Sequence, residues 1–202
     1  MLSIESLKID LAKGLHAEIC DPCIDLFFSY MIDDNPFNSN SELDDWIKTI
    51  NTNQPFKVNK KNISDLDLWN INNRTGDLEH ASGRFFSIRG LNVNTNKGLL
   101  ASWDQPIIDQ QEIGILGILA KKFDGILYFL MQAKAEPGNI NTYQISPTVQ
   151  ATRSNFQMIH KGKATNYLEY FIKAKSDDVI IDQLQSEQGA RFFNKRNRNM
   201  LI

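Results

Sequence analysis

Apolar and polar residues alternate along the stretch "FLMQAKAEPGNINTYQISPTVQATRSN", with a break at Pro-Gly-Asn. Because successive side chains of a strand point to opposite faces, this pattern predicts a β-hairpin. The polar positions on one predicted face are Gln132, Lys134 and Glu136 before the turn and Gln144, Ser146, Thr148 and Gln150 after it. Pairing Lys134 with Gln144, and Gln132 with Ser146, puts both rows on the same face, whereas a slip of one residue would separate them. Pro147 cannot donate to a ladder, so its strand is predicted to lie at an edge or to bulge.

The pattern before this hairpin changes from helical to β-rich. Residues 1 to about 50 are predicted to be helical, and the clearest helix follows a capping box of Ser41 and Asp44. Its apolar face would consist of Leu43, Trp46, Ile47 and Ile50. Residues 83–93 predict a strand, and Asp124-Gly125 is a turn signal between two further strands.

The pattern after the hairpin predicts one more strand and a helix. Residues 166–174, "NYLEYFIKA", indicate the strand. Residues 176–199 indicate the helix, because Asp177 and Asp178 suit its positive start and a basic cluster suits its negative end. The basic cluster could instead bind phosphate, but a solvated face that matches the helix dipole explains it more simply. The pattern therefore predicts a chain with a helical first part and a β-rich second part.

Composition narrows the possible functions. The chain has 202 residues, 42% hydrophobic and 23% charged, which is typical of a globular domain or a tight pair of domains. A net charge of -2 argues against a dedicated nucleic-acid binder. No apolar run reaches membrane-spanning length, and the first residues lack the features of a signal peptide, so we expect a cytoplasmic protein without a membrane partner.

The cysteines occur as Cys20-Asp-Pro-Cys23, with His16 four residues earlier. Such a motif could be a redox pair or half of a zinc site. With no second CxxC in the sequence, two incidental reduced thiols are the simpler interpretation, and we predict no metal site.

The mixed polar face has two interpretations. It could be the solvated face of an antiparallel sheet, which is common. It could also be the floor of a pocket for a ligand rich in hydroxyl and carbonyl groups, because amides and hydroxyls together offer donors and acceptors to a sugar. The sequence contains no GxGxxG, Walker, HExxH or GxSxG motif, so Rossmann hydride transfer, P-loop phosphate chemistry and serine hydrolysis lack support.

Other residues could complete such a pocket. Arg84, Arg89 and Arg153 carry guanidinium groups, which hold phosphates through paired hydrogen bonds. Trp103 and Gln105 put an aromatic ring beside an amide in a predicted loop, which suits stacking on a nucleobase and contact with its edge. Each arginine could equally be an ordinary surface residue, and Trp103 could pack in the core.

Several stretches together resemble the NDP-hexose 2,3-dehydratases of deoxysugar biosynthesis. These are "SGRFFSIRGLNV", "WDQPIIDQQEIGILGIL", "LMQAKAEPGNINTYQISPTVQATRSNF" and "QSEQGARFFNKRNRNM". The resemblance implies a Nudix-like α+β fold, with a mixed, mainly antiparallel sheet and flanking helices. Members carry two related modules, and this chain resembles the N-terminal one. We therefore expect a helical extension over 1–55 and a Nudix-like module over 56–202, with the C-terminal module absent. The metal-binding glutamate box of Nudix hydrolases has no match.

The resemblance also implies a reaction. The substrate would be an NDP-4-keto-6-deoxyhexose, with a dTDP-linked sugar the expected form in this family. Loss of the C2 hydroxyl and the C3 proton would give a 3,4-diketo-2,6-dideoxy sugar without a redox cofactor. Glu136 is the candidate base, and Lys134 would stabilise the enolate or hold a phosphate. Glu136 could instead simply pair with Lys134 near the turn.

The remaining candidate residues receive substrate-binding roles under this hypothesis. The sugar would contact Gln132, Gln144, Ser146, Thr148 and Gln150, the base Trp103 and Gln105, and the diphosphate Arg84, Arg89 and Arg153, with Asn155 in the same motif. The enzyme would work as a homodimer or with a separately encoded second module. The alternative is a nucleotide-sugar-binding half-module that is inactive alone, or the remnant of a split gene.

Overall fold

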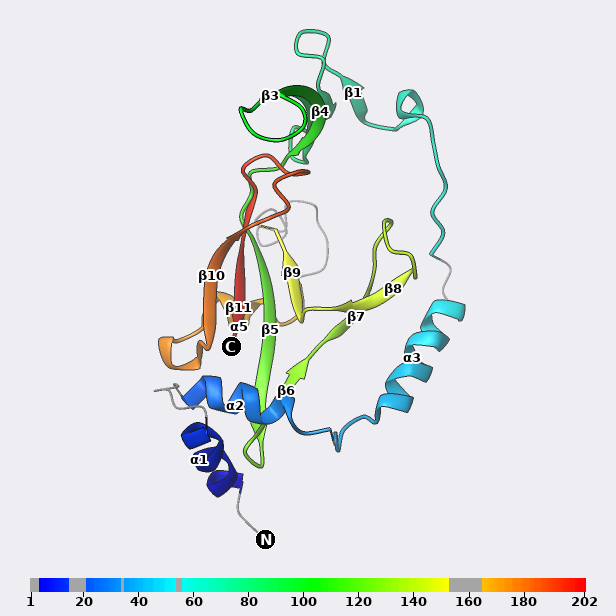
Figure 1. The fold of residues 1–202 in the computed structure, drawn as a ribbon. Helices are drawn as coiled ribbons and strands as arrows, with labels where there is room; N and C mark the ends of the chain where they lie inside the picture. The colour runs from blue at the N-terminus through cyan, green and yellow to red at the C-terminus, as the bar shows by residue number, and fades with distance from the viewer. Residues whose placement is uncertain (1–3, 15–20, 34, 54–55, 153–164) are drawn as a thin grey trace.

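The computed structural model describes residues 4–14, 21–33, 35–53, 56–152 and 165–202, and it is an α+β structure (Figure 1). The helices and 3-10 turns are α1 (Ile4–Gly14), α2 (Asp21–Tyr30), α3 (Asn40–Asn53), η1 (Ile63–Asp65), α5 (Leu168–Ile172) and η2 (Ser176–Asp178). The strands are β1 (Trp69–Ile71), β2 (Leu78–His80), β3 (Ser87–Asn94), β4 (Ser102–Asp109), β5 (Gly114–Phe123), β6 (Ile126–Leu130), β7 (Gln132–Ala135), β8 (Tyr143–Ser146), β9 (Val149–Ala151), β10 (Ile181–Ser186) and β11 (Arg196–Leu201). The predicted α+β class is confirmed.

The main sheet, defined as β10-β11-β5-β6 with β9, is built around β5. β11 runs parallel to β5 along one edge, whereas β9 and then β6 run antiparallel along the other. The turn between β5 and β6 contains Asp124 and Gly125, both with positive φ, as the Asp-Gly signal predicts. β5 is therefore the central strand of this sheet, because β11, β9 and β6 all pair with it (Figure 1).

The hydrophobic core lies where α5 packs on the main sheet. Phe171 of α5 and Val149 of β9 are 1% and 0% exposed, and Ile115 and Met200 belong to the same cluster. Gly117 makes this packing possible, because a Cβ at that position would lie 2.2 Å from the Phe171 ring. The packing of the core thus requires a glycine at position 117 of β5.

The distal sheet, defined as β1-β2-β3-β4, is formed by antiparallel strands. Its edge strand β4 is joined to the segment before β11 by two backbone hydrogen bonds, from the Ile108 amide to the Arg191 carbonyl (2.8 Å) and from the Phe193 amide to the Ile108 carbonyl (2.9 Å). These bonds connect the distal sheet to the main sheet.

The polar hairpin, defined as β7-β8, is a separate two-stranded ladder that projects from the main sheet (Figure 1). Asn51 of α3 satisfies the backbone of β8 at Tyr143: its amide oxygen accepts from the Tyr143 amide (2.8 Å) and its amide nitrogen donates to the Tyr143 carbonyl (3.1 Å). A helix side chain thereby takes the place of a neighbouring strand at that point.

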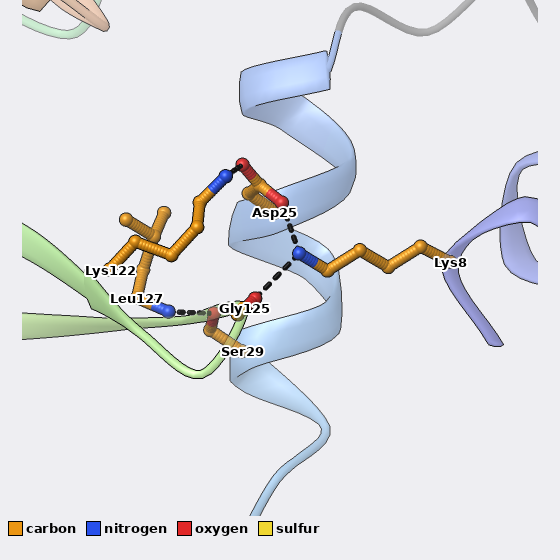
Figure 2. Close-up of polar contacts among 6 residues, drawn as sticks. All are labelled: Lys8, Asp25, Ser29, Lys122, Gly125 and Leu127. Atoms are coloured by element: carbon orange, nitrogen blue, oxygen red, sulfur yellow. Dashed lines mark hydrogen bonds and ion pairs between the residues drawn. The ribbon is translucent and has the colours of Figure 1, made fainter. Parts of the chain in front are cut away.

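The first two helices are fastened to the β5–β6 turn through Asp25 of α2 (Figure 2). Its carboxylate accepts from Lys8 of α1 at 2.5 Å and from Lys122 of β5. Lys8 also donates to the Gly125 carbonyl at 2.5 Å, and the Ser29 hydroxyl accepts from the Leu127 amide at 2.8 Å. Burial raises the pKa of Asp25, but the two lysines outweigh it and hold that pKa below its ordinary value.

The helical start of the chain is confirmed, with one correction to its capping. Helix α3 begins at Asn40, and the capping box consists of Ser39 and Glu42 rather than Ser41 and Asp44. The Ser39 amide donates to the Glu42 carboxylate (2.8 Å), and the Glu42 amide donates to the Ser39 hydroxyl (3.2 Å). Both bonds that the Glu42 carboxylate accepts from Ser39 lower the pKa of Glu42. The bond from the backbone amide has the larger effect, and the bond from the hydroxyl has the smaller one.

The predicted strand over 166–174 is wrong, because these residues form α5. Leu168 and Phe171 are three residues apart, and both are buried against the main sheet. A spacing of three residues puts both side chains on one face of a helix. The short apolar run that contains them had indicated a strand instead.

The predicted helix over 176–199 is also wrong. After η2 the chain forms β10 and β11, which pair in antiparallel register with Asp182 opposite Met200. Arg198 holds Asp182 with two bonds, Nε–Oδ1 at 2.7 Å and Nη2–Oδ2 at 2.5 Å. This hydrogen bonding lowers the pKa of Asp182 and raises that of Arg198. Arg198, one of the basic residues that suggested a helix end, instead forms an ion pair with Asp182 across two strands.

Candidate functional site

The polar hairpin has the predicted register. Gln132 lies opposite Ser146 and Lys134 lies opposite Gln144, as alternation across the Pro-Gly-Asn break required. The turn is closed by a hydrogen bond from the Asn139 amide to the Glu136 carbonyl at 3.1 Å. The hairpin therefore presents its amide, hydroxyl, ammonium and carboxylate groups on one face.

The second polar row does not continue unbroken past Pro147, because β8 ends at Ser146 and β9 begins at Val149. β9 pairs with β5 and no longer with β7. Thr148 is consequently 5% exposed, and its hydroxyl accepts from the Leu119 amide (2.9 Å) and donates to the Leu130 carbonyl. The Thr148 side chain therefore bonds to backbone groups of the main sheet and is not part of the polar face, which corrects the prediction for this residue.

Gln132 also has a structural contact. Its side-chain amide donates to the Pro147 carbonyl at 2.9 Å, at the point where the chain leaves the hairpin for the main sheet. Pro147 lies in neither strand, because β8 ends at Ser146 and β9 begins at Val149, so the predicted edge strand or bulge at this position is a break between two strands.

A pocket of about 230 Å³ lies between the polar hairpin and the main sheet. Its lining residues are Leu116, Lys134, Glu136, Asn139, Gln144, Ile145, Ser146, Pro147 and Gln150. Five of the residues predicted from the polar face line it, namely Lys134, Glu136, Gln144, Ser146 and Gln150. The structure thus brings together the chemically mixed part of the predicted site.

An ion pair lines one side of this pocket. The Lys134 ammonium lies 3.0 Å from the Glu136 carboxylate, and their side chains are 33% and 44% exposed. Lys134 also donates to the Gln150 amide oxygen at 2.7 Å. The Gln150 amide nitrogen donates to Glu136 at 3.4 Å. A carboxylate and an ammonium therefore lie side by side at this pocket.

Four of the lining residues were not predicted from the sequence, namely Leu116, Asn139, Ile145 and Pro147. Asn139 was interpreted only as part of the turn, although its position beside Glu136 was a signal that the turn could reach the pocket; its amide donates to the Thr142 carbonyl at 3.3 Å. Leu116 reaches the pocket because β5 pairs with β9, where Leu116 lies opposite Gln150. That long-range pairing leaves no signal in the local sequence.

The predicted nucleotide-binding residues that the structure describes lie elsewhere, on or next to the distal sheet. Arg89 of β3 forms ion pairs with Asp109 (3.0 Å) and Asp77 (3.5 Å), so its guanidinium already has carboxylate partners. Arg84 precedes β3 and is exposed. Neither arginine lines the hairpin pocket.

Trp103 and Gln105 lie within β4, so the predicted loop there is wrong. The Trp103 indole donates to Gln105 at 2.8 Å, and Gln105 donates to the Ala190 carbonyl at 3.0 Å. Arg153 and Asn155 lie outside the described residues.

A larger hollow of about 430 Å³ lies on β3 and β4. Its lining residues are Gly90, Leu91, Asn92, Asp104, Gln105 and Pro106. Within it, Asp104 is engaged by Asn92, whose amide donates at 2.8 Å. Among the described residues that line this hollow, none carries an ammonium or guanidinium group that could stabilise an oxyanion, so we place the candidate site at the smaller hairpin pocket.

Neither a metal-ligand cluster nor a membrane-spanning helix is found in the described residues. These residues contain no group of three or more His, Cys, Asp or Glu side chains able to hold a metal ion. Cys23 lies in α2, whereas Cys20 and His16 fall outside the described residues. None of the described helices is both long and apolar enough to span a bilayer.

Comparison with known proteins gives a consistent answer. The sequence model of the family described as NDP-hexose 2,3-dehydratase matches residues 40–202. A dTDP-4-dehydro-6-deoxy-alpha-D-glucopyranose 2,3-dehydratase of Saccharopolyspora spinosa is 52% identical over 147 residues, which is 73% of this chain and 30% of the relative. A protein of the same name from Amycolatopsis orientalis is 51% identical over 162 residues, or 78% of this chain and 34% of the relative.

A third relative of that name, from Streptomyces violaceoruber, is 48% identical over 148 residues, covering 73% of this chain and 33% of the relative. The chain therefore spans about a third of the length of the curated relatives that it matches.

Proposed function

This chain belongs to the NDP-hexose 2,3-dehydratase family, and from that premise we propose that it dehydrates an NDP-4-keto-6-deoxyhexose. The enzyme would be a carbon–oxygen lyase of deoxysugar biosynthesis. The names of the relatives favour a dTDP-linked 4-keto-6-deoxyglucose as the substrate. The observation that carries the proposal is the Lys134–Glu136 pair in a polar pocket of a chain with this family membership.

Glu136 and Lys134 would divide the chemistry of the elimination. The C4 ketone acidifies the C3 hydrogen, so the Glu136 carboxylate takes that proton and an enolate forms across C3 and C4. The Lys134 ammonium stabilises the charge that develops on the enolate oxygen. The electron pair then returns to form the C2–C3 double bond as the C2 hydroxyl leaves with a proton as water.

The first product relaxes without further help from the protein. It is an enol at C3, and transfer of its proton to C2 gives a 3-ketone beside the 4-ketone. The net change is the loss of one water, so no electron is gained or lost and no redox cofactor is required.

The pocket would hold the sugar and leave the nucleotide outside. A volume of about 230 Å³ is below the roughly 300–1,000 Å³ of pockets that enclose a drug-sized ligand, so a nucleoside diphosphate must extend beyond it. Gln144 and Ser146 offer donors and acceptors to the sugar hydroxyls. The nucleotide-binding roles of Arg84, Arg89, Trp103 and Gln105 stay predictions, and their place away from this pocket argues against direct contact with the sugar.

The fold that carries this site would be Nudix-like. Support comes from the mixed sheet, in which β11 is parallel to β5 while the other neighbours of β5 are antiparallel, with α5 packed on it. The division into a helical extension over 1–55 and a module over 56–202 stays a prediction. So do the cytoplasmic location and the partnership with a second copy or a second module.

A second candidate function is sugar-nucleotide binding without catalysis. It is favoured by the span of the chain, about a third of the length of its relatives, because residues needed for turnover could lie in the remaining two thirds. The pocket would then hold the sugar while another surface supplied the missing groups.

Incubation of the purified chain with dTDP-4-keto-6-deoxyglucose separates these functions. Mass spectrometry should show the loss of one water from the nucleotide sugar. Calorimetric binding of an unchanged sugar would reject the dehydratase and leave the binding module. Absence of both binding and conversion would reject the two proposals together.

A further inference from the structure

Gln150 lies on the part of the pocket wall that belongs to the main sheet. It is the central residue of β9 and lies opposite Leu116 of β5. Its neighbours Val149 and Ala151 point to the other face and are 0% and 3% exposed. Because both neighbours are fixed in the core, the backbone of Gln150 cannot move without disrupting the main sheet.

The side chain of Gln150 is engaged at both ends. Its amide oxygen accepts from the Lys134 ammonium at 2.7 Å and, more weakly, from the Ser146 hydroxyl at 3.4 Å. Its amide nitrogen donates to the Glu136 carboxylate at 3.4 Å. An ammonium can only donate and a carboxylate can only accept, so these two partners fix the orientation of the amide.

We propose that Gln150 is a positioning residue that holds the Lys134 ammonium and the Glu136 carboxylate against the wall of the main sheet. This inference rests on the proposed function, in which those two groups perform the elimination. It also replaces the sequence-based role of Gln150 as a sugar contact, because both ends of its amide already have protein partners.

The physical argument concerns freedom of movement. Lys134 and Glu136 are long side chains at the free end of a two-stranded ladder, and their direct pair at 3.0 Å leaves the two able to move together. Gln150 adds one bond to each from a different sheet, which defines where the pair lies in the pocket. A displacement of about 1 Å at a reacting group can cost on the order of a hundredfold in rate.

An amide is the side chain that this position needs. A glutamate would still accept from Lys134, but it would bring a second negative charge to Glu136 and lose the donor. A methionine has a similar length and offers neither contact. Two variants of nearly constant volume therefore separate the parts of the network.

Steady-state kinetics of Gln150→Met test the inference. We expect kcat to fall about 10- to 100-fold with KM changed less than twofold, because the sugar contacts remain and the reacting pair is displaced. Gln150→Glu should lower kcat at least as much. Gln185→Met is the matched control, since Gln185 lies on the exposed strand β10 and contacts Gln183, and it should behave as wild type.

Two kinetic outcomes would overturn the inference. An increase in KM at constant kcat would make Gln150 a sugar contact, and unchanged kinetics would leave it without a role in the pocket. Circular dichroism of each variant shows whether a loss of rate reflects unfolding.

A readout without turnover keeps the inference separate from the proposed function. In nitrogen-edited NMR, the side-chain NH2 signals of Gln150 are those that disappear in Gln150→Met. They should shift in both Lys134→Met and Glu136→Gln, and not in Gln185→Met. If the wild-type chain does not convert the sugar, the proposed function fails and these shifts alone decide the inference; signals that stay in place in both variants would overturn it.

Discussion

At the scale of single residues, the site depends on an ordinary pair of charges in an unusual setting. Lys134 and Glu136 lie two positions apart on one strand face, a spacing that on an exposed sheet would give a weak surface ion pair. Here a pocket and the Gln150 amide lie beside them. The setting, rather than the pair, is what supports a catalytic role.

Glu136→Gln should lower the dehydration rate by about 10²–10⁴-fold, the usual contribution of a general base. The substitution keeps the size of a side chain that is 44% exposed, so the melting temperature should stay close to that of wild type. Rates are measured by the loss of water from the nucleotide sugar in a mass spectrum. A variant with full activity would remove Glu136 from the mechanism.

The sequence predicted the part of the site that depends on alternation and missed the part that depends on strand pairing. Lys134 and Gln144 follow from the period of two and the turn. Thr148 was placed wrongly because the chain changes sheets at Pro147, and no local pattern shows which strand β9 will join.

For several secondary-structure elements, tertiary packing determines whether the segment is a helix or a strand, against the preference predicted from its local sequence. α5 is a helix because its two buried residues, Leu168 and Phe171, meet the main sheet, and Gly117 leaves room for the Phe171 ring. β10 and β11 are strands because they extend a sheet whose other members lie far earlier in the chain. The Asp-Gly hairpin and the first helices were predictable because their signals are local.

Gly117→Ala should destabilise the protein by about 1–3 kcal/mol, the usual cost of overpacking a core. Its new methyl group would lie 2.2 Å from the Phe171 ring, so the ring or α5 must move. The matched control is Gly90→Ala in β3, where a Cβ would meet nothing within 4 Å. Equal urea midpoints for the two variants would contradict this account of the core.

Asp25→Asn should loosen α1 and α2 from the β5–β6 turn. Loss of hydrogen bonds to charged groups costs about 1.5–3 kcal/mol, and Lys8 would lose its carboxylate partner while nearly buried. Hydrogen exchange of the amides in α1 and α2 should accelerate. Asp10→Asn is the control, because the exposed Asp10–Lys13 pair at 3.7 Å contributes little, and equal acceleration in both variants would contradict the role of Asp25.

At the scale of the whole molecule, a few polar links join separate layers. Asp25 joins the first helices to the main sheet, Asn51 joins α3 to the polar hairpin, and Ile108 joins the distal sheet to the segment before β11. The pocket lies at one of these junctions, between the polar hairpin and the main sheet. Its shape therefore depends on how the layers are held together.

The contribution of Asp25 to stability should depend on pH in a defined direction. Its folded pKa lies below the ordinary value of about 3.9, so the stabilisation is fully present above that value and is lost as the pH falls through the folded pKa. The difference in urea midpoint between wild type and Asp25→Asn should therefore shrink below about pH 4. A difference that stays constant, or widens, as the pH falls further would contradict the ion-pair account.

Proton NMR of the reaction in D2O decides whether this chain removes water from the sugar of an NDP-4-keto-6-deoxyhexose, as we propose. With dTDP-4-keto-6-deoxyglucose, the account predicts that the C3 hydrogen signal disappears, that C2 becomes a methylene carrying one deuterium from the solvent, and that Glu136→Gln prevents both changes. A spectrum in which the C2 and C3 hydrogens of the substrate remain unchanged in the presence of the wild-type chain would contradict it.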